Sequence, residues 1–195
     1  MRVGVLGVQG AIEEHLTMLA CLIGERNVVR VKNKQDLARI SGLIIPGGES
    51  TVISRLMIST GLFDLIRKRG VEGMPILGTC AGLIVLAKQG DEQVKQTGQK
   101  LLGLMDTKIK RNAFGRQKDS FEAALEIPVL GKEPFTGVFI RAPIVQKILD
   151  KRKVEVLARF KGKIVGVQQG NILATAFHPE LSGDTRMHEY FLELL

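Results

Sequence analysis

The sequence predicts an α/β fold with a mostly parallel central sheet and additional antiparallel strands in its second half. Short apolar strands alternate with amphipathic helices up to about residue 89, and strand-like segments dominate beyond it. The composition is globular, with 45% hydrophobic residues, 22 glycines and 6 prolines among 195 residues. Since the chain shows neither an internal repeat nor a linker, we expect one domain spanning residues 1–195.

The first 40 residues indicate two strands, each followed by a helix. Arg2–Val8 is an apolar run rich in β-branched residues that ends at Gln9-Gly10, and Ala11–Leu22 then carries apolar residues at helical spacing. Val28–Val31 is a second short apolar run, and Gln35–Ile40 follows with a brief helical pattern.

The next strands are fully apolar, as expected of strands buried on both faces of a parallel sheet. Gly42–Ile45 ends at Pro46-Gly47-Gly48, after which Ser50 or Thr51 is expected to cap a helix that stops at Gly61. The following elements are a helix over Leu62–Arg69, a strand over Pro75–Gly78 and a helix over Leu83–Lys88.

The second half is richer in strand patterns, after a polar and helix-poor stretch over Gly90–Lys100. Lys161-Gly162-Lys163 predicts a tight hairpin turn into Ile164–Gln168. The other expected elements are strands around Thr107–Lys110, Phe121–Ile127, Gly137–Ile140, Val154–Phe160 and Asn171–Phe177, and a closing helix over Thr185–Leu194.

The charge and the cysteine content exclude several classes of protein. The chain has 28 Lys and Arg against 20 Asp and Glu, a formal charge of +8, but the cations cluster only briefly, at Lys108–Arg116 and Lys151–Lys153. With one Tyr and no Trp, this favours a solvated basic surface or an acidic protein partner over nucleic-acid binding.

Two cysteines outside any CxxC pair argue against disulfides and zinc, and no apolar run approaches the roughly 20 residues that span a bilayer. We therefore expect a cytoplasmic protein without a metal ion.

Cys80 lies in Gly78-Thr79-Cys80-Ala81-Gly82, a G-x-C-x-G pattern between an apolar strand and a helix. Such a turn needs small neighbours, lifts the thiol above the strand ends and sets it beside a helix N-terminus, which favours thiolate. The backbone N–H of Ala81 would then be placed to bind an oxyanion. The alternative is an inert cysteine flanked by packing glycines. Cys21 falls on an amphipathic helix pattern and is expected in the core.

His178 is the histidine whose neighbours suit a general base. Pro179 forbids helix continuation and pushes His178 toward extended geometry, in which residues two apart share a face. Glu180 is thereby placed to hold one ring nitrogen and leave the other for a proton. His15 and His188 fall on helix patterns and are interpreted as surface or packing residues.

Pro46–Thr51 is a second loop at the end of an apolar strand, where adjacent glycines let backbone approach a ligand. The loop lacks the GK[ST] ending of a P-loop, and a plain strand-to-helix turn is the alternative. Arg111, Arg116 and Arg141 lie near strand ends, where arginine can bind a carboxylate, although most arginines are only solvated.

In combination these motifs resemble the class I (triad) glutamine amidotransferases, and within them the glutaminase subunits of pyridoxal 5′-phosphate synthase. The resemblance spans nearly the whole chain in family order and is weaker between Lys88 and Lys100. The cysteine elbow and the H-P-E sequence mark the superfamily. PGGEST, RNAFGRQ and FIRAP are the more specific signature of the subunit. The segments that carry the resemblance are Gly4 to Gly10, Pro46 to Thr51, Gly78 to Gly82, Arg111 to Gln117, Asp119 to Glu122, Phe139 to Pro143 and Phe177 to Leu181.

The resemblance implies a flavodoxin-like three-layer fold with Cys80 as nucleophile, His178 as acid and base, and Glu180 as its orienter. It implies an oxyanion hole formed by backbone N–H groups of Ala81 and of the Gly47-Gly48 turn. The residues implied to bind glutamine are Gly48, Glu49, Ser50, Arg111, Ile140 and Arg141, with the carboxylate of residue 49 expected to meet the substrate ammonium and an arginine the substrate carboxylate.

The resemblance further implies a partner, a (β/α)₈ synthase subunit that uses the ammonia to build pyridoxal 5′-phosphate within a hetero-oligomeric complex. The glutaminase itself would carry no cofactor and would be sluggish until docking rearranges the Gly47-Gly48 peptide. The turn at Gln9 and the helix after it are the candidate docking surface. Two alternatives stay open: a glutaminase that serves another acceptor, which the PGGEST and RNAFGRQ motifs argue against, and a flavodoxin-type binding module in which Cys80 is structural.

Overall fold

The computed structural model describes residues 1–114 and 120–195, and its elements follow the predicted alternation through the first half of the chain. The helices and strands of that half are β1 (Val3–Leu6), α1 (Ile12–Ile23), β2 (Val28–Val31), α2 (Lys34–Ala38), β3 (Gly42–Ile45), α3 (Ser50–Ser59), α4 (Leu62–Val71), β4 (Ile76–Thr79), α5 (Ala81–Leu86) and β5 (Ala87–Gln89). Those of the second half are α6 (Glu92–Gln96), β6 (Met105–Lys110), β7 (Phe121–Leu125), β8 (Phe135–Phe139), β9 (Ile144–Ile148), β10 (Glu155–Phe160), β11 (Lys163–Gln169), β12 (Ile172–Thr175), the 3-10 turn η3 (Pro179–Leu181) and α7 (Arg186–Leu192).

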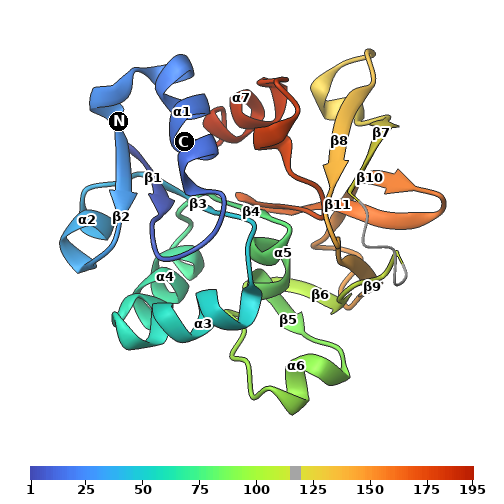
Figure 1. The fold of residues 1–195 in the computed structure, drawn as a ribbon, viewed down its shortest axis with the longest axis horizontal. Coiled ribbons are helices and arrows are strands. Elements are labelled where there is room, and N and C mark those ends of the chain that lie inside the picture. The colour runs from blue at the N-terminus through green and yellow to red at the C-terminus, as the bar shows by residue number, and fades with distance from the viewer. Residues whose placement is uncertain (115–119) are drawn as a thin grey trace.

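Among the described residues, ten strands form one sheet in the order β2-β1-β3-β4-β12-β11-β9-β6-β5, with β10 beside β11 (Figure 1). Strands β2, β1, β3, β4 and β12 pair in parallel, whereas β12 with β11, β11 with β9 and β9 with β6 pair antiparallel. The predicted parallel sheet with added antiparallel strands is therefore confirmed. Because β4 and β12 are neighbours, the two halves of the chain share one sheet.

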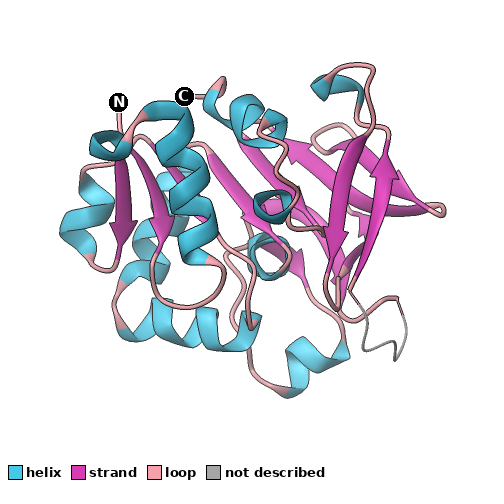
Figure 2. Ribbon diagram, turned by 45° about the horizontal axis from the view of Figure 1, so that its top comes forward, coloured by secondary structure: helices cyan, strands magenta, loops and turns pink. Residues whose placement is uncertain are grey.

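Helices cover both faces of this sheet (Figure 2). Strand β3 has apolar side chains on both faces, since Leu43 and Ile45 join the core under α2 to α5 while Ile44 joins the core under α1 and α7. Such burial on two faces explains why β3 is an unbroken apolar run. The β7–β8 hairpin extends the core that lies under α1 and α7, and its Phe135 and Phe139 are fully buried there. None of the helices in the described part of the chain is long and apolar enough to cross a membrane.

Some predicted element boundaries are wrong. The helix expected over Leu83–Lys88 begins at Ala81 and ends at Leu86, because Ala87 turns extended and pairs with Met105 of β6. The stretch expected to be helix-poor contains α6, whose first turn is capped by the Asp91 side chain accepting the N–H of Val94. Strand β9 was not expected, since its mixed polar and apolar residues give only a weak strand pattern.

Two residue-level expectations on helices also fail. The cap of α3 is Glu49, whose carboxylate accepts the N–H of Thr51, so neither Ser50 nor Thr51 caps this helix. Cys21 is exposed, although it was expected in the core. It lies two residues after buried Leu19, which is about 200° around the helix, so it falls on the opposite face.

Candidate active site

Four neighbouring parallel strands end at one edge of the sheet, and the loop after each carries a predicted site residue. Gln9 follows β1, Gly47 and Gly48 follow β3, Cys80 follows β4, and His178 follows β12. The strand ends are level, because Ile45 is in register with Gly78 and Thr79 with Thr175. Parallel pairing therefore brings together Cys80 and His178, which are almost 100 positions apart in the sequence.

Cys80 occupies the sharp turn predicted between β4 and α5. Its φ is 48°, a left-handed value that is rare for a residue with a side chain, and its N–H donates to Thr175 O at 2.8 Å. The turn needs glycine beside it, since a Cβ on Gly82 would lie 2.3 Å from Ile45 O. The thiol lies 3.8 Å from Ile140 O and lines a pocket. The glycines pack closely, as the inert alternative required, but the thiol still reaches the cavity.

The His178 side chain forms a hydrogen bond with Glu180, as expected for residues two apart in an extended segment. The ring Nδ1 lies 2.6 Å from Glu180 Oε1, and the backbone N–H donates to Val138 O at 2.8 Å. Gly47 packs against the Cε1 side of this ring so closely that a Cβ there would lie 2.2 Å from His178 Cε1. The imidazole is thus held in place by the carboxylate and by the glycine bend.

The charges around His178 favour its protonated form. Burial alone lowers the pKa of the imidazole, but hydrogen bonds to Cys80 and Glu180 and the charges of both residues outweigh it and raise this pKa to about 10. The shift depends on the thiol lying next to the ring. The arrangement can therefore support an imidazolium between a thiolate and a carboxylate.

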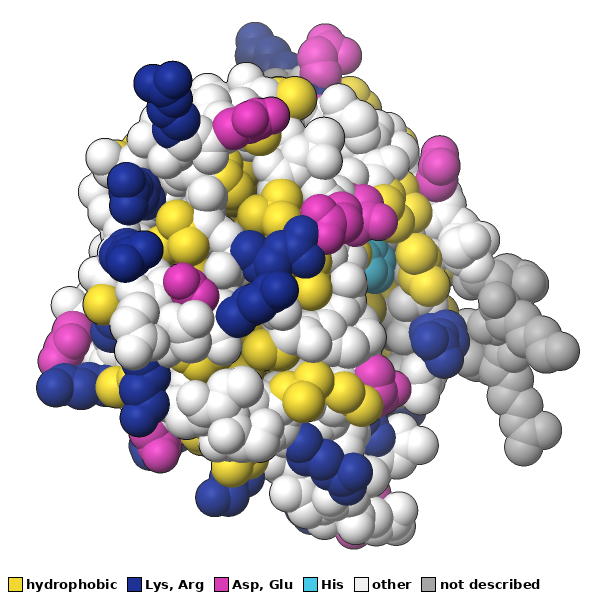
Figure 3. All heavy atoms as spheres, turned by 60° about the vertical axis from the view of Figure 1, so that its left-hand side comes forward, with side chains coloured by type: hydrophobic (Ala, Val, Ile, Leu, Met, Phe, Trp, Pro, Cys, Tyr) yellow, Lys and Arg dark blue, Asp and Glu magenta, His cyan; other side chains and the backbone are white. Residues whose placement is uncertain are grey.

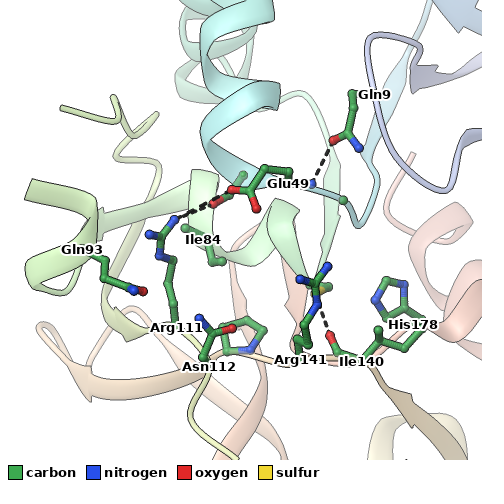
Figure 4. Close-up of a pocket in the computed structure, with 13 residues that line it drawn as sticks. Gln9, Glu49, Ile84, Gln93, Arg111, Asn112, Ile140, Arg141 and His178 are labelled. Atoms are coloured by element: carbon green, nitrogen blue, oxygen red, sulfur yellow. Dashed lines mark hydrogen bonds and ion pairs between the residues drawn. The ribbon is translucent and has the colours of Figure 1, made fainter. Parts of the chain in front are cut away.

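The pocket has a volume of about 440 Å³, and the side chains that Figure 4 labels surround it. All six residues predicted to bind glutamine line it. The lining residues are Gln9, Gly48, Glu49, Ser50, Cys80, Ile84, Gln93, Arg111, Asn112, Ile140, Arg141, Pro143 and His178. The lining residues that were not predicted from the sequence are Ile84, Gln93, Asn112 and Pro143. Positions 115–119 of the RNAFGRQ and DSFE motifs, Arg116 among them, lie outside the described residues.

Gln99 joins two predicted binding residues beneath the pocket. Its Oε1 accepts hydrogen bonds from Ser50 Oγ at 3.2 Å, Thr51 Oγ1 at 3.3 Å and Arg111 NH1 at 3.3 Å. The backbone N–H of Arg111 donates to Asp91 Oδ2 at 2.7 Å. Gln99 and Asp91 fall in the polar stretch Gly90–Lys100, which carries no motif, so no sequence pattern selected them.

The glycine bend is tied to the N-terminal turn by two hydrogen bonds. Gln9 Oε1 accepts the N–H of Glu49 at 2.9 Å, and Gly47 O accepts the N–H of Ala11 at 3.0 Å. The Glu49 side chain is 55% exposed and lies 4.0 Å from Arg111 NH1 at the pocket rim. Ala81, the other predicted oxyanion residue, opens α5, where the first N–H groups have no intrahelical acceptor.

His15 and His188 were interpreted as surface or packing residues, and both are fully buried. His15 Nε2 lies 3.3 Å from Glu180 Oε2, and His15 Nδ1 lies 2.9 Å from His188 Nε2. The packing interpretation is therefore incomplete, because the pair extends from the carboxylate that holds His178.

Away from the pocket, the basic residues that the structure describes form no continuous patch on the face that Figure 3 shows. On the face shown in Figure 3, Lys and Arg side chains are spread out and lie among acidic, apolar and uncharged groups. Within residues 1–114 and 120–195, no group of three or more His, Cys, Asp or Glu side chains is arranged to hold a metal ion.

Comparison with known proteins agrees with this geometry. The chain matches the SNO glutamine amidotransferase family over residues 5–195. It is 53% identical to the pyridoxal 5′-phosphate synthase subunit PdxT of Methanosarcina mazei, covering 99% of this chain and 98% of that protein. The PdxT subunit of Moorella thermoacetica is 51% identical over the full length of both chains. The crystal structure of a glutamine amidotransferase matches with a TM-score of 0.89 at 46% identity, covering 100% of this chain and 98% of that one, which confirms the predicted amidotransferase fold. Since the family match spans residues 5–195 and both PdxT subunits are more than 50% identical over nearly the whole chain, the chain belongs to the SNO glutamine amidotransferase family.

Proposed function

We propose that this chain is the glutaminase subunit of a pyridoxal 5′-phosphate synthase, with Cys80, His178 and Glu180 as its triad in one domain of residues 1–195. Full-length similarity to PdxT subunits supports the assignment, and the shared sheet supports the single domain. The observation that carries the triad is the 2.6 Å bond between His178 and Glu180 beside the strained Cys80 turn.

In the first half of the reaction, the Cys80 thiolate attacks the side-chain amide carbon of glutamine. The carbon–nitrogen bond breaks as the His178 imidazolium gives its proton to the departing ammonia, and a γ-glutamyl thioester remains on the sulfur. The raised pKa of His178 supports this step, because the ring holds the needed proton at neutral pH.

In the second half, neutral His178 takes a proton from a water molecule that attacks the thioester carbon. The carbon–sulfur bond breaks, glutamate leaves, and the thiolate and imidazolium are restored. Glu180 holds Nδ1 throughout, so that the other ring nitrogen faces the reacting groups.

The oxyanion that forms in each half would be bound by the N–H groups of Ala81 and Gly48. Gly47 O accepts the Ala11 N–H, so the N–H of Gly48, on the opposite side of the same peptide, points away from the N-terminal turn. Docking at that turn would loosen the bond to Ala11 and let the peptide rotate. We therefore propose Gln9 and α1 as docking surface for the synthase subunit.

For the substrate, Glu49 is the proposed partner of the ammonium, and Arg111 or Arg141 that of the carboxylate. Their positions around one pocket, with Gly48, Ser50 and Ile140, support this division (Figure 4). Three further statements remain predictions from the family resemblance. They are the (β/α)₈ fold of the synthase subunit, the hetero-oligomeric complex and the cytoplasmic location.

The test is to mix the chain with a pyridoxal 5′-phosphate synthase subunit and to measure glutamate formation before and after. We expect a large rise on mixing, loss of all activity in Cys80→Ala, and ammonia incorporation into pyridoxal 5′-phosphate. Glutamate release without incorporation would instead favour another ammonia acceptor. Absence of glutamate formation even with the synthase subunit present would leave only a binding module, and unchanged activity in Cys80→Ala would exclude Cys80 as the nucleophile.

A further inference from the structure

Two buried histidines lie behind the carboxylate of Glu180. His15 comes from α1 and His188 from α7, helices that pack against each other (Figure 1), and both side chains are 0% exposed. His15 Nε2 lies 3.3 Å from Glu180 Oε2 and 3.2 Å from Thr79 Oγ1. Since Thr79 directly precedes Cys80, His15 links the carboxylate to the strand that carries the thiol.

The hydrogen bonds select one tautomer for each ring. One of the two nitrogens that meet between His15 and His188, 2.9 Å apart, must donate. If His15 Nδ1 donated, His188 would carry its proton on Nδ1, which has no partner among the residues described, and His15 would turn a lone pair toward Glu180. If His188 Nε2 donates instead, every N–H of the pair finds an acceptor. A buried unpaired donor is costly, so the second arrangement is favoured.

In that arrangement His15 Nε2–H faces an oxygen that needs a donor. Glu180 Oε2 is enclosed and lacks a well-aligned hydrogen bond within the described part of the chain, while Oε1 is bound to His178. A buried carboxylate is stable only when its oxygens are compensated. The His15 N–H, which Thr79 Oγ1 at 3.2 Å shares, lies 3.3 Å from Oε2, provides that compensation as a close dipole and leaves Oε1 for His178.

Both rings are neutral at neutral pH. Burial, together with the charges of His188 and His178, holds the pKa of His15 well below 6.5, and burial lowers the pKa of His188 to about 4. A charged His15 would pair with Glu180 and weaken the hold of that carboxylate on His178. A neutral N–H donor orients the carboxylate without cancelling its charge.

We propose that His15, fixed in its tautomer by His188, is a positioning residue for Glu180 and thereby for the reacting imidazole. The inference rests on the proposed triad. The proposed role of His15 differs from core packing, because an apolar side chain would fill the same buried space as well if only packing were required.

The test compares His15→Leu, which removes the donor, with His15→Gln, whose amide N–H replaces Nε2–H. Both are assayed with the synthase subunit present. We expect His15→Leu to lower kcat about 10-fold to 100-fold, the size of one lost hydrogen bond to a charged group, with KM changed less than about threefold. His15→Gln should recover kcat to within about fivefold of the wild type.

A second readout follows the alkylation of Cys80 by iodoacetamide against pH, without glutamine. His15→Leu should move the midpoint of this profile to higher pH, because a carboxylate that no donor orients can turn away from His178 and then stabilises the imidazolium less. His15→Gln should restore the midpoint. If His15→Leu does not fold, His15→Asn, whose shorter amide cannot reach Glu180, should show the same losses.

Phe191→Leu is the matched control, since Phe191 is also fully buried, follows His188 by about one turn of α7 and lies outside the proposed docking surface. It should lower the melting temperature without changing kcat or the alkylation profile. The inference is overturned if His15→Leu keeps more than half of the wild-type kcat, or if His15→Leu and His15→Gln lose activity equally. Activity in Cys80→Ala would instead overturn the triad itself, so the two failures are distinguishable.

Discussion

Replacing Gly47 by Ala tests whether the position of the His178 imidazole limits the reaction. A Cβ on Gly47 would lie 2.2 Å from His178 Cε1 and 2.8 Å from Nδ1, whereas ordinary contact begins at 3.4 Å. The ring would therefore have to retreat by roughly 1 Å. The substitution adds no backbone strain of the left-handed kind, because Gly47 is not among the glycines with positive φ.

The Cα of Gly47 cannot retreat in place of the ring, because the other side of the bend is filled and a rotation of the Gly47-Gly48 peptide on docking would leave this Cα in place. Gly47 O accepts the N–H of Ala11 at 3.0 Å, and even a Cβ on Gly10 would lie 1.9 Å from that oxygen. A catalytic group misplaced by about 1 Å costs on the order of 10²-fold in rate. We therefore expect Gly47→Ala to lower kcat/KM about 100-fold, mostly through kcat.

The assay measures initial rates of glutamate formation with the synthase subunit present, and the melting temperature of each variant. Gly42→Ala is the control, because its Cβ would lie 2.4 Å from Leu195 Cδ2 but at the opposite end of β3 and against the last residue, which can move. It should keep kcat within about twofold. A folded Gly47→Ala protein with kcat within about threefold of the wild type would refute the reasoning.

Three further measurements test the pocket and its charges. Glu49→Gln should raise KM for glutamine about 10-fold while alkylation of Cys80 is unchanged, and an unaltered KM would remove Glu49 from the ammonium site. Gln99→Leu removes the acceptor shared by Ser50, Thr51 and Arg111, and should raise KM about fivefold or more with a smaller effect on kcat, whereas an unchanged KM would show that Gln99 does not position them. Because the pKa of His178 is raised from 6.5 to about 10, its stabilisation of the fold is complete below about pH 6.5 and is lost as pH rises through about 10. The melting temperature of the wild type should accordingly fall toward that of His178→Asn across this range, and a constant difference would contradict the raised pKa.

Local chemistry explains which parts of the site could be predicted from sequence. The elbow around Cys80 and the extended His178-Pro179-Glu180 segment follow from short-range rules on small residues and proline. The convergence of Cys80 and His178 depends on β4 lying next to β12, which no periodicity encodes. The convergence of Cys80 and His178 was predicted from the family resemblance, and the pairing of β4 with β12 agrees with that prediction.

The residues that sequence reasoning missed owe their roles to distant partners. The pattern of α1 indicates which face is buried but not that His15 meets Glu180 and His188 there. Gln99 lies in a polar stretch and acquires its partners only through the packing of α3 against the loop after α6. Glu49 caps α3 through its own side chain, although serine and threonine beside it are more usual caps.

The Gly47-Gly48 bend belongs to both the proposed triad and the proposed docking turn, and this separates what docking can change from what it cannot. Gly47 contacts the His178 ring, and its carbonyl accepts the N–H of Ala11. The N–H of Glu49, two residues further along, donates to Gln9 Oε1. The bond between His178 and Glu180 involves neither Gln9 nor Ala11. Docking should therefore raise kcat by completing the oxyanion hole and leave the thiolate–imidazolium pair unchanged. Alkylation of Cys80 by iodoacetamide should proceed at the same rate, within about twofold, with and without the synthase subunit, while glutamate formation rises greatly. A parallel rise in both rates would mean that docking assembles the triad itself.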